Sequence, residues 1–341
     1  MAKRISLVFL GIILGLAGAE LILRVFKLAP EVAWISRGRY RLSANAILGY
    51  EPVPGLKYDG KELTFYDYRS RETNREGYRD YNHDIRKKPG TFRIAVLGDS
   101  IAMGLWIKDM HDAFPLKLEA ELKKKGVSAE VLNFGVVGYN TIQEVETLRE
   151  KVLKYSPDLV VLEYCLNDTE RNDGYLLGIL LDQEKRSEKI NAARVSRLLG
   201  WSALYRFLKF RLIQPARGQR ELKIKKQRVF LSIDTVDLAF KKLSELLKDS
   251  GIELLVVIFP DFTDLNNYRR HKEHSRIISL ARRYNFKVLD LLEAYRACNK
   301  QNHGRPLSFD QYHPNQTGHA CAARAIAEKI LSFVGSKPAA G

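Results

Sequence analysis

The stretch that decides the fold is Phe92-Arg93-Ile94-Ala95-Val96-Leu97, which is followed at once by Gly98-Asp99-Ser100. A short apolar run that ends at a glycine predicts a strand buried on both faces of a sheet. The serine comes directly after this strand and before a segment that we expect to be helical. A side chain in that position is exposed at a rigid edge of the sheet, where a nucleophile can be reached.

Strands and helices are predicted to alternate along the chain after residue 90. This alternation indicates a parallel sheet that is covered by helices on both faces. Thr141 and Glu144 suit a capping box at the start of one helix. The expected strands are 92–97, 129–133, 158–164, 252–258 and 286–290, and the expected helices are 112–125, 141–155, 234–249, 269–284 and 316–333.

The N-terminus carries an export signal. Lys3-Arg4 precedes a charge-free apolar run from Ile5 to Ala19. One interpretation is a signal peptide that is cleaved after Ala17-Gly18-Ala19 and leaves a secreted protein. The other, which we favour, is an uncleaved anchor. It reaches the length of about 20 residues that a span needs only by including Glu20 and Arg24. In both cases the basic end stays in the cytoplasm and the rest of the chain is exported, to the periplasm or beyond.

Three further regions follow the N-terminal segment of residues 1–30. Residues 31–90 are rich in Tyr, Arg, Gly and Pro and predict an extension of loops and short strands. Residues 91–335 form the expected main domain, which is interrupted by an insertion at about 169–230. We expect the apolar stripe of this insertion to pack on the main core; a lid, a substrate wall and a membrane-facing surface are the alternatives. The stripe consists of Leu198, Trp201, Tyr205, Leu208 and Leu212.

The charge of the chain is concentrated in the insertion. The whole chain has a net charge of +16, and residues 183–228 contain 14 Lys or Arg against 3 Glu. Such a patch suits an anionic membrane surface, an acidic polymer or nucleic acid. The sequence has neither a zinc pattern nor an RNA-binding aromatic motif, so we expect no nucleic acid partner and no metal. Three cysteines are not a disulfide framework, and a Cys298–Cys321 bridge stays open.

Three residues suit nucleophilic catalysis. A serine hydroxyl needs a base to take its proton, and a carboxylate holds that base in the right tautomer. Ser100 is the candidate nucleophile, His313 the candidate base and Asp310 the orienting carboxylate. The spacing of Asp310 and His313 allows both to lie on one tight turn.

An oxyanion needs donors that already point at it. The backbone N–H of Ser100 at a helix start is one candidate. Gly138 follows the second predicted strand, and a glycine there lets the backbone approach a substrate closely. Asn167 follows the third predicted strand and offers a side-chain amide. In an open α/β sheet these positions converge on one edge.

These residues resemble the four sequence blocks of the SGNH hydrolases, also called GDSL-like esterases and lipases. The blocks match Gly98-Asp99-Ser100-Ile101, Asn133 to Gly138, Asn167-Asp168 and Asp310 to His313, in that order. The resemblance covers about residues 91–335. It implies a three-layer α/β/α fold with a flavodoxin-like, five-stranded parallel sheet. It also implies a triad of Ser100, Asp310 and His313, with an oxyanion hole formed by Ser100, Gly138 and Asn167.

Two residues depart from the family pattern, and one further segment extends the resemblance. Ile101 replaces the usual leucine, and Cys165 stands where many members have a glycine, which leaves the shape of that loop open. Asn74-Arg75-Glu76-Gly77-Tyr78-Arg79 is similar to a segment of membrane-anchored bacterial members. We expect Arg79 to bridge this segment to the main domain.

The sequence therefore predicts an exported serine esterase without a cofactor. We expect it to hydrolyse short-chain, O-acetyl-type esters on a glycan through an acyl-Ser100 intermediate. Three alternatives stay open: an O-acyltransferase acting on a cell-envelope polysaccharide, a lipid esterase with the insertion as its lid, and a non-catalytic glycan-binding protein. Resemblance to the family indicates the reaction chemistry more firmly than it indicates the biological substrate.

Overall fold

A computed structural model describes residues 2–26, 40–45, 47–54, 73–166, 199, 201–208 and 233–334. The chain divides into two compact units. One contains the N-terminal helix and part of the insertion, and the other contains the sheet, the extension and the C-terminal helices. Asn167, Leu198 and Leu212 lie outside the described residues.

The larger unit is built on a five-stranded, fully parallel sheet. Its strand order, β4-β3-β5-β6-β7, is flavodoxin-like and puts the topological switch point beside β3. Nearly every residue of β3 and β5 is buried, as expected for strands that are covered on both faces. The predicted fold class is confirmed. The strands are β3 (Phe92–Leu97), β4 (Ala129–Asn133), β5 (Leu159–Cys165), β6 (Glu253–Phe259) and β7 (Lys287–Asp290).

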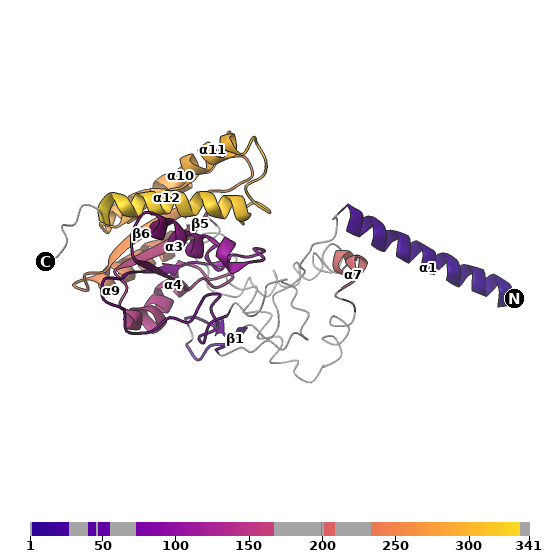
Figure 1. The fold of residues 1–341 in the computed structure, drawn as a ribbon, viewed down its shortest axis with the longest axis horizontal. Helices are drawn as coiled ribbons and strands as arrows, with labels where there is room; N and C mark the ends of the chain where they lie inside the picture. Colours follow the sequence, from indigo (N-terminus) through magenta and orange to yellow (C-terminus); the bar gives the residue numbers. More distant parts are fainter. Residues whose placement is uncertain are drawn as a thin grey trace. The chain divides into compact units, whose positions relative to one another are not determined.

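Helices cover the sheet in two groups (Figure 1). In the first group α12 packs on both α3 and α11, and a disulfide between Cys298 and Cys321 joins α11 to α12. In the second group α9 packs on both α4 and α10. The first group is α3 (Phe114–Lys124), α11 (Leu292–Gln301) and α12 (Gln316–Val334), and the second is α4 (Thr141–Thr147), α9 (Ile233–Leu247) and α10 (His271–Arg283).

Local structure differs from the sequence prediction in two places. The predicted helix 141–155 is α-helical only over α4 and continues as a π-helical turn, Leu148–Val152, and a 3₁₀ turn, Leu153–Tyr155. Its capping box uses Asn140 and Gln143, so the predicted pair Thr141 and Glu144 was wrong by one residue. Asn140 is the N-cap residue because its side-chain oxygen accepts hydrogen bonds from the backbone N–H groups of the first turn. Helix α11 was not predicted.

The extension contributes a small antiparallel pair of strands, β1 (Tyr40–Leu42) and β2 (Tyr50–Pro52), followed by loops from residue 73. Tyr50 packs edge-on against Tyr139 at a ring distance of 5.1 Å. Its hydroxyl donates to the carbonyl of Val137 at 2.7 Å. The extension is thereby tied to the loop that follows β4.

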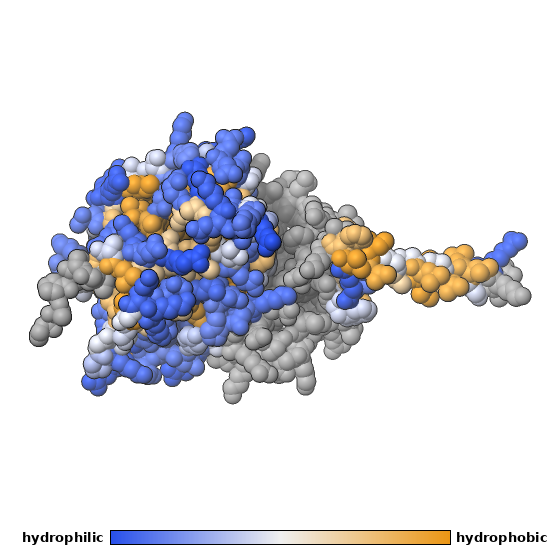
Figure 2. All heavy atoms as spheres, turned by 45° about the horizontal axis from the view of Figure 1, so that its top comes forward, coloured by the Kyte–Doolittle hydropathy of each residue, from blue (hydrophilic) through white to orange (hydrophobic). Residues whose placement is uncertain are grey.

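The smaller unit contains α1 (Ala2–Val25) and α7 (Ala203–Leu208). Ser6–Val25 is long and apolar enough to cross a membrane or to be a signal sequence, with a mean hydropathy of 2.3. On the face shown in Figure 2, hydrophobic residues cover α1 beyond its hydrophilic N-terminal end.

Two described residues of the predicted apolar stripe are exposed. Trp201 is 60% exposed and Leu208 is 39% exposed. The buried side of α7 instead presents Ala203, Leu204 and Phe207, which pack against Leu23 of α1. This contact lies within the smaller unit, so the expectation that the stripe packs on the main core stays a prediction.

Candidate active site

Ser100 is the first residue of α2 (Ser100–Met103), a single helical turn directly after β3. Asp99 caps this turn, because its carboxylate accepts from the N–H of Ile101 at 2.7 Å. Gly98 is required by packing, since a side chain there would collide with Glu163 and with Ala102. These constraints fix the serine at the carboxyl end of the central strand.

Asp310 and His313 lie on one tight loop before α12. Phe309 N–H donates to the carbonyl of His313 at 2.8 Å, and a bridge between Ser308 and Pro314 closes the loop. His313 Nε2 lies 2.9 Å from Ser100 Oγ. Its Nδ1 lies 2.9 Å and 2.8 Å from the two carboxylate oxygens of Asp310. The structure thus brings together three residues that are up to 213 positions apart.

The electrostatics of this trio favour one tautomer. Burial alone would raise the pKa of Asp310, but hydrogen bonds from His313 and from the backbone of Tyr312 hold it below its usual value. An ionised Asp310 can only accept, so the proton of neutral His313 sits on Nδ1. Nε2 then presents a lone pair to the Ser100 hydroxyl, which is the arrangement a general base needs.

One candidate oxyanion donor, Gly138, lies on the loop after β4. Val136 N–H donates to the carbonyl of Gly98 at 3.1 Å, so this loop runs beside the nucleophile turn. Gly138 follows with φ of 76°, a left-handed conformation that favours glycine. A Cβ at this position would lie 3.0 Å from Tyr50 Oη. Asn167, the third expected donor, lies outside the described residues.

Two residues near the site were missed by sequence reasoning. Trp106 has φ of 66°, an unusual conformation for a bulky residue, and its ring packs at 4.8 Å against the imidazole of His313. Glu163 is 1% exposed in β5 and its carboxylate accepts from Asp99 N–H at 3.0 Å. A glutamate within an apolar strand was a usable signal for Glu163, whereas no sequence pattern marks Trp106.

The extension braces the nucleophile turn through Arg79. The guanidinium of this 2% exposed residue donates to the carbonyl of Gly104 at 2.7 Å and to that of Ile107 at 2.6 Å. These carbonyls flank Trp106. The predicted bridge from Arg79 to the main domain is therefore present, and it holds the turn that contacts His313.

A second set of hydrogen bonds connects Asp80 of the extension to β4, and we call this set the Asp80 brace. Asp80 Oδ2 accepts from Asn133 N–H at 2.8 Å. The Asn133 amide donates to the carbonyl of Ala102 at 2.9 Å, and its oxygen accepts from Gly135 N–H at the same distance. Asn133, the first residue of the second sequence block, thus connects the extension, α2 and the loop that leads to Gly138.

His83 completes this brace as an imidazolium. Its Nε2 lies 2.9 Å from Asp80 and its Nδ1 lies 2.7 Å from Glu130. A neutral imidazole donates from only one nitrogen, so two carboxylate partners select the doubly protonated ring. Burial alone would lower the pKa of His83, but the hydrogen bonds and charges of Asp80 and Glu130 raise it to about 9. Burial raises the pKa of Asp80, and the His83 imidazolium opposes that effect.

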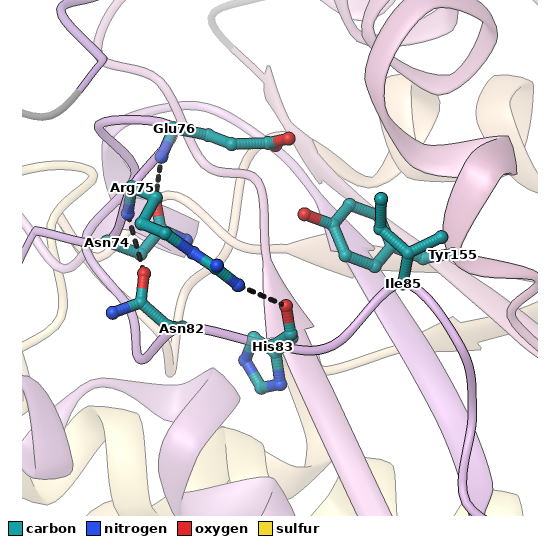
Figure 3. A pocket seen from close by; sticks show the side chains of 7 residues that line it. All are labelled: Asn74, Arg75, Glu76, Asn82, His83, Ile85 and Tyr155. Atoms are coloured by element: carbon teal, nitrogen blue, oxygen red, sulfur yellow. Dashed lines mark hydrogen bonds between the residues drawn. The ribbon is translucent and has the colours of Figure 1, made fainter.

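A small pocket of about 150 Å³ lies on the outer side of this brace (Figure 3). Its polar groups largely bond one another: Arg75 N–H donates to Asn82 at 2.7 Å, and the Arg75 guanidinium donates to the His83 carbonyl at 3.3 Å. Asn74 accepts from Glu76 N–H at 3.0 Å. None of the expected catalytic or oxyanion residues lines this pocket.

His319, the remaining histidine near the site, is structural. It is 1% exposed on α12, and its Nδ1 accepts from Phe114 N–H at 3.1 Å. Burial lowers the pKa of His319 to about 3, so the ring stays neutral. Within the described part of the chain, no group of three His, Cys, Asp or Glu side chains is arranged to hold a metal ion.

The model of the GDSL-like lipase/acylhydrolase family matches residues 96–321. The chain belongs to this family. The matched span contains Ser100, Gly138, Asn167, Asp310 and His313. The protein is therefore a carboxylic ester hydrolase of the SGNH type, as the sequence blocks predicted.

Solved structures similar to this hydrolase include several esterases. An acetyl xylan esterase is 18% identical, with a TM-score of 0.43, and the match covers 71% of this chain and 99% of the other. A two-domain esterase active on acetylated mannans is 17% identical, with a TM-score of 0.43 and coverage of 74% and 51%. An acetylxylan esterase from Geobacillus stearothermophilus is 18% identical, with a TM-score of 0.44 and coverage of 74% and 98%. A comparison with curated protein sequences found no significant match.

Proposed function

We propose that Ser100, His313 and Asp310 form the catalytic triad of this hydrolase. The observation that carries the proposal is the pair of contacts made by His313, to Ser100 at 2.9 Å through Nε2 and to Asp310 through Nδ1. The three groups can act in nucleophilic catalysis from the positions that they occupy, without rearrangement. The base is in reach of the nucleophile, and the carboxylate holds its tautomer.

The reaction proceeds in two displacements. Ser100 Oγ attacks the ester carbonyl while His313 Nε2 takes the hydroxyl proton, which gives a tetrahedral oxyanion. The N–H groups of Ser100 and Gly138 and the amide of Asn167 donate to that oxyanion. His313 then gives the proton to the leaving alcohol, and an acyl-Ser100 ester remains. Water repeats the sequence on the acyl-enzyme, with His313 as base and then as acid, and releases the carboxylic acid.

The proposed substrate is a short acyl ester on a glycan. The Asp310 side chain is 37% exposed, so the Asp310 end of the triad lies at the surface. Phe309 is 48% exposed and stands perpendicular to Trp106, beside His313. The exposed Phe309, packed on the half-buried Trp106, offers the apolar face of a sugar ring a surface to pack on. The basic segment 183–228 favours a glycan that carries negative charge.

The proposed location is the outer side of a membrane, with α1 as an uncleaved anchor. The helix Ser6–Val25 has the required length, and Lys3-Arg4 favours a cytoplasmic N-terminus. The disulfide between Cys298 and Cys321 supports an oxidising compartment for the main domain.

The experiment is hydrolysis of an aryl acetate by the full chain in detergent, beside its Ser100→Ala variant. We expect the variant to lose several orders of magnitude in kcat, with unchanged thermal unfolding. A series of longer acyl chains then tests the substrate class, and a preference for long chains indicates a lipid esterase. Acyl label that moves to an added polysaccharide, instead of appearing as free acid, indicates a transferase. Equal activity in wild type and variant contradicts the serine mechanism.

A further inference from the structure

The end of α1 is attached to α7 by the half-buried carboxylate of Glu20. Glu20 Oε2 accepts from Ser202 Oγ and from Leu204 N–H, both at 2.8 Å. Glu20 Oε1 accepts from Ala203 N–H at 2.9 Å and from Arg24 Nε at 2.7 Å. One carboxylate thus receives four donors, three of them from a segment more than 180 positions away.

Further contacts reinforce this attachment. Arg24 also donates to the carbonyl of Trp201 at 2.8 Å, and its guanidinium lies 5.9 Å from the centre of the Trp201 ring. Leu23 is 8% exposed and Ala203 is 1% exposed where α1 and α7 pack together. Polar and apolar contacts therefore fix α7 on the last turns of α1.

The position of Glu20 in the apolar helix sets the depth of α7. An unsatisfied carboxylate in a membrane-spanning helix is costly, and such residues are found paired or close to the interface. The helix Ser6–Val25 extends over about 30 Å at 1.5 Å per residue, which equals the thickness of the hydrocarbon layer. Glu20 is five residues before Val25, about 7 Å from the end of the span. The donors of α7 then lie within about one and a half helical turns of the outer end of the span.

Three apolar side chains of this segment are exposed. Trp201, Leu199 and Leu208 are 60%, 42% and 39% exposed. Tryptophan is enriched at the membrane interface because its ring has an apolar body and one polar donor. Exposed apolar side chains on a segment held at the end of a membrane span match the lipid boundary in both position and chemistry.

We propose that residues 199–208 dock on the outer bilayer surface, with Trp201 and Leu208 at the headgroup boundary and Glu20 as the clasp that holds α7 there. This inference rests on the anchoring of α1 in Proposed function. It assigns this part of the insertion to the lipid surface.

The first test measures the depth of Trp201. The full chain is reconstituted into phosphatidylcholine–phosphatidylglycerol vesicles, with and without lipids brominated near the headgroup end of the acyl chain. The fluorescence of wild type minus that of Trp201→Phe isolates this ring from the other two tryptophans. We expect brominated lipid to reduce the difference signal about twofold or more, because the ring lies at the boundary. An unquenched signal in a protein that resists alkaline extraction overturns docking and leaves the anchor intact.

The second test breaks the clasp. Glu20→Ala removes the acceptor for all four donors while making α1 more apolar, so we expect the variant to stay in the membrane. Quenching of Trp201 should fall to less than half, and protease cleavage within 199–208 should rise at least severalfold. Leu21→Ala, at an exposed position on the same turn of α1, is the matched control. Unchanged quenching in Glu20→Ala contradicts the clasp, and release of the wild type by alkaline extraction overturns anchor and docking together.

Discussion

Because His83 is an imidazolium in the folded protein, we predict a specific dependence of the free energy of unfolding on pH. His83 is 9% exposed and bonds Asp80 and Glu130, and its pKa in the folded protein is raised from 6.5 to about 9. A group with a raised folded pKa stabilises the protein fully below the unfolded pKa. That stabilisation is lost as pH rises through the folded pKa. The window is therefore from pH 6.5 to about 9.

The size of the effect follows from the shift. One pKa unit corresponds to about 1.4 kcal/mol, so His83 contributes about 3 kcal/mol to the free energy of unfolding below the window. His83→Gln removes this titration and keeps hydrogen-bonding capacity at the position. We expect the stability difference between wild type and variant to shrink by about 3 kcal/mol between about pH 6 and about pH 10.

The assay is urea unfolding of the full chain in detergent, followed by near-ultraviolet circular dichroism. His271→Gln changes an exposed histidine at the start of α10 and serves as the matched control. Its difference from wild type should stay flat over the same pH range. A wild-type to His83→Gln difference that stays constant, or that grows toward alkaline pH, would falsify the imidazolium assignment.

Three further substitutions test the site, each with aryl acetate hydrolysis and thermal unfolding. Gly138→Ala should cost about 1–2 kcal/mol, because φ is 76°, and lower kcat about 100-fold by displacing the backbone N–H; wild-type kcat would show that activity does not need the left-handed conformation of glycine at this position. Asn167→Ala should lower kcat about 100- to 1,000-fold with unchanged stability, and a loss of only a few-fold removes its amide from the mechanism. Arg79→Ala removes the guanidinium donor from the carbonyls of Gly104 and Ile107, of which Gly104 keeps the N–H of Ile107, so the free energy of unfolding should fall by about 1–3 kcal/mol. Because those carbonyls flank the residue that packs on His313, kcat should fall by up to about 100-fold, and full activity in a folded Arg79→Ala contradicts this positioning role.

The strands and most helices could be predicted because their signals are local. The run 92–97 and its four companions are apolar over the length of a strand, and the structure places each strand within one residue of its expected bounds. Helix α11 was missed because its sequence, 292–301, is mostly polar and only Leu292, Tyr295 and Cys298 are buried. A helix with so few apolar residues gives only a weak periodic signal in the sequence. Its buried face becomes evident only when the helix that it packs against is known.

The contacts of the insertion could not be predicted in the same way. Trp201, Tyr205 and Leu208 recur at helical spacing and predicted an apolar face, whereas the contact with α1 is made by Ala203. Apolar spacing shows that a helix has a face, but it does not show which surface that face meets. The partner is Leu23, and the contact depends on a glutamate within α1 that accepts from the start of α7.

The sequence by itself determined the class of sheet, the family and the identity of the residues expected at the site, because order along the chain and local apolar pattern carry that information. Only the tertiary structure decided that His313 Nε2 faces Ser100 at 2.9 Å and that Trp106 packs on the imidazole. It also decided that Arg79 holds the turn that contains Trp106. Each of these contacts joins segments that are far apart in sequence or depends on an unusual backbone angle. Such contacts form only when the sheet brings its strand ends to one edge, so no local pattern encodes them.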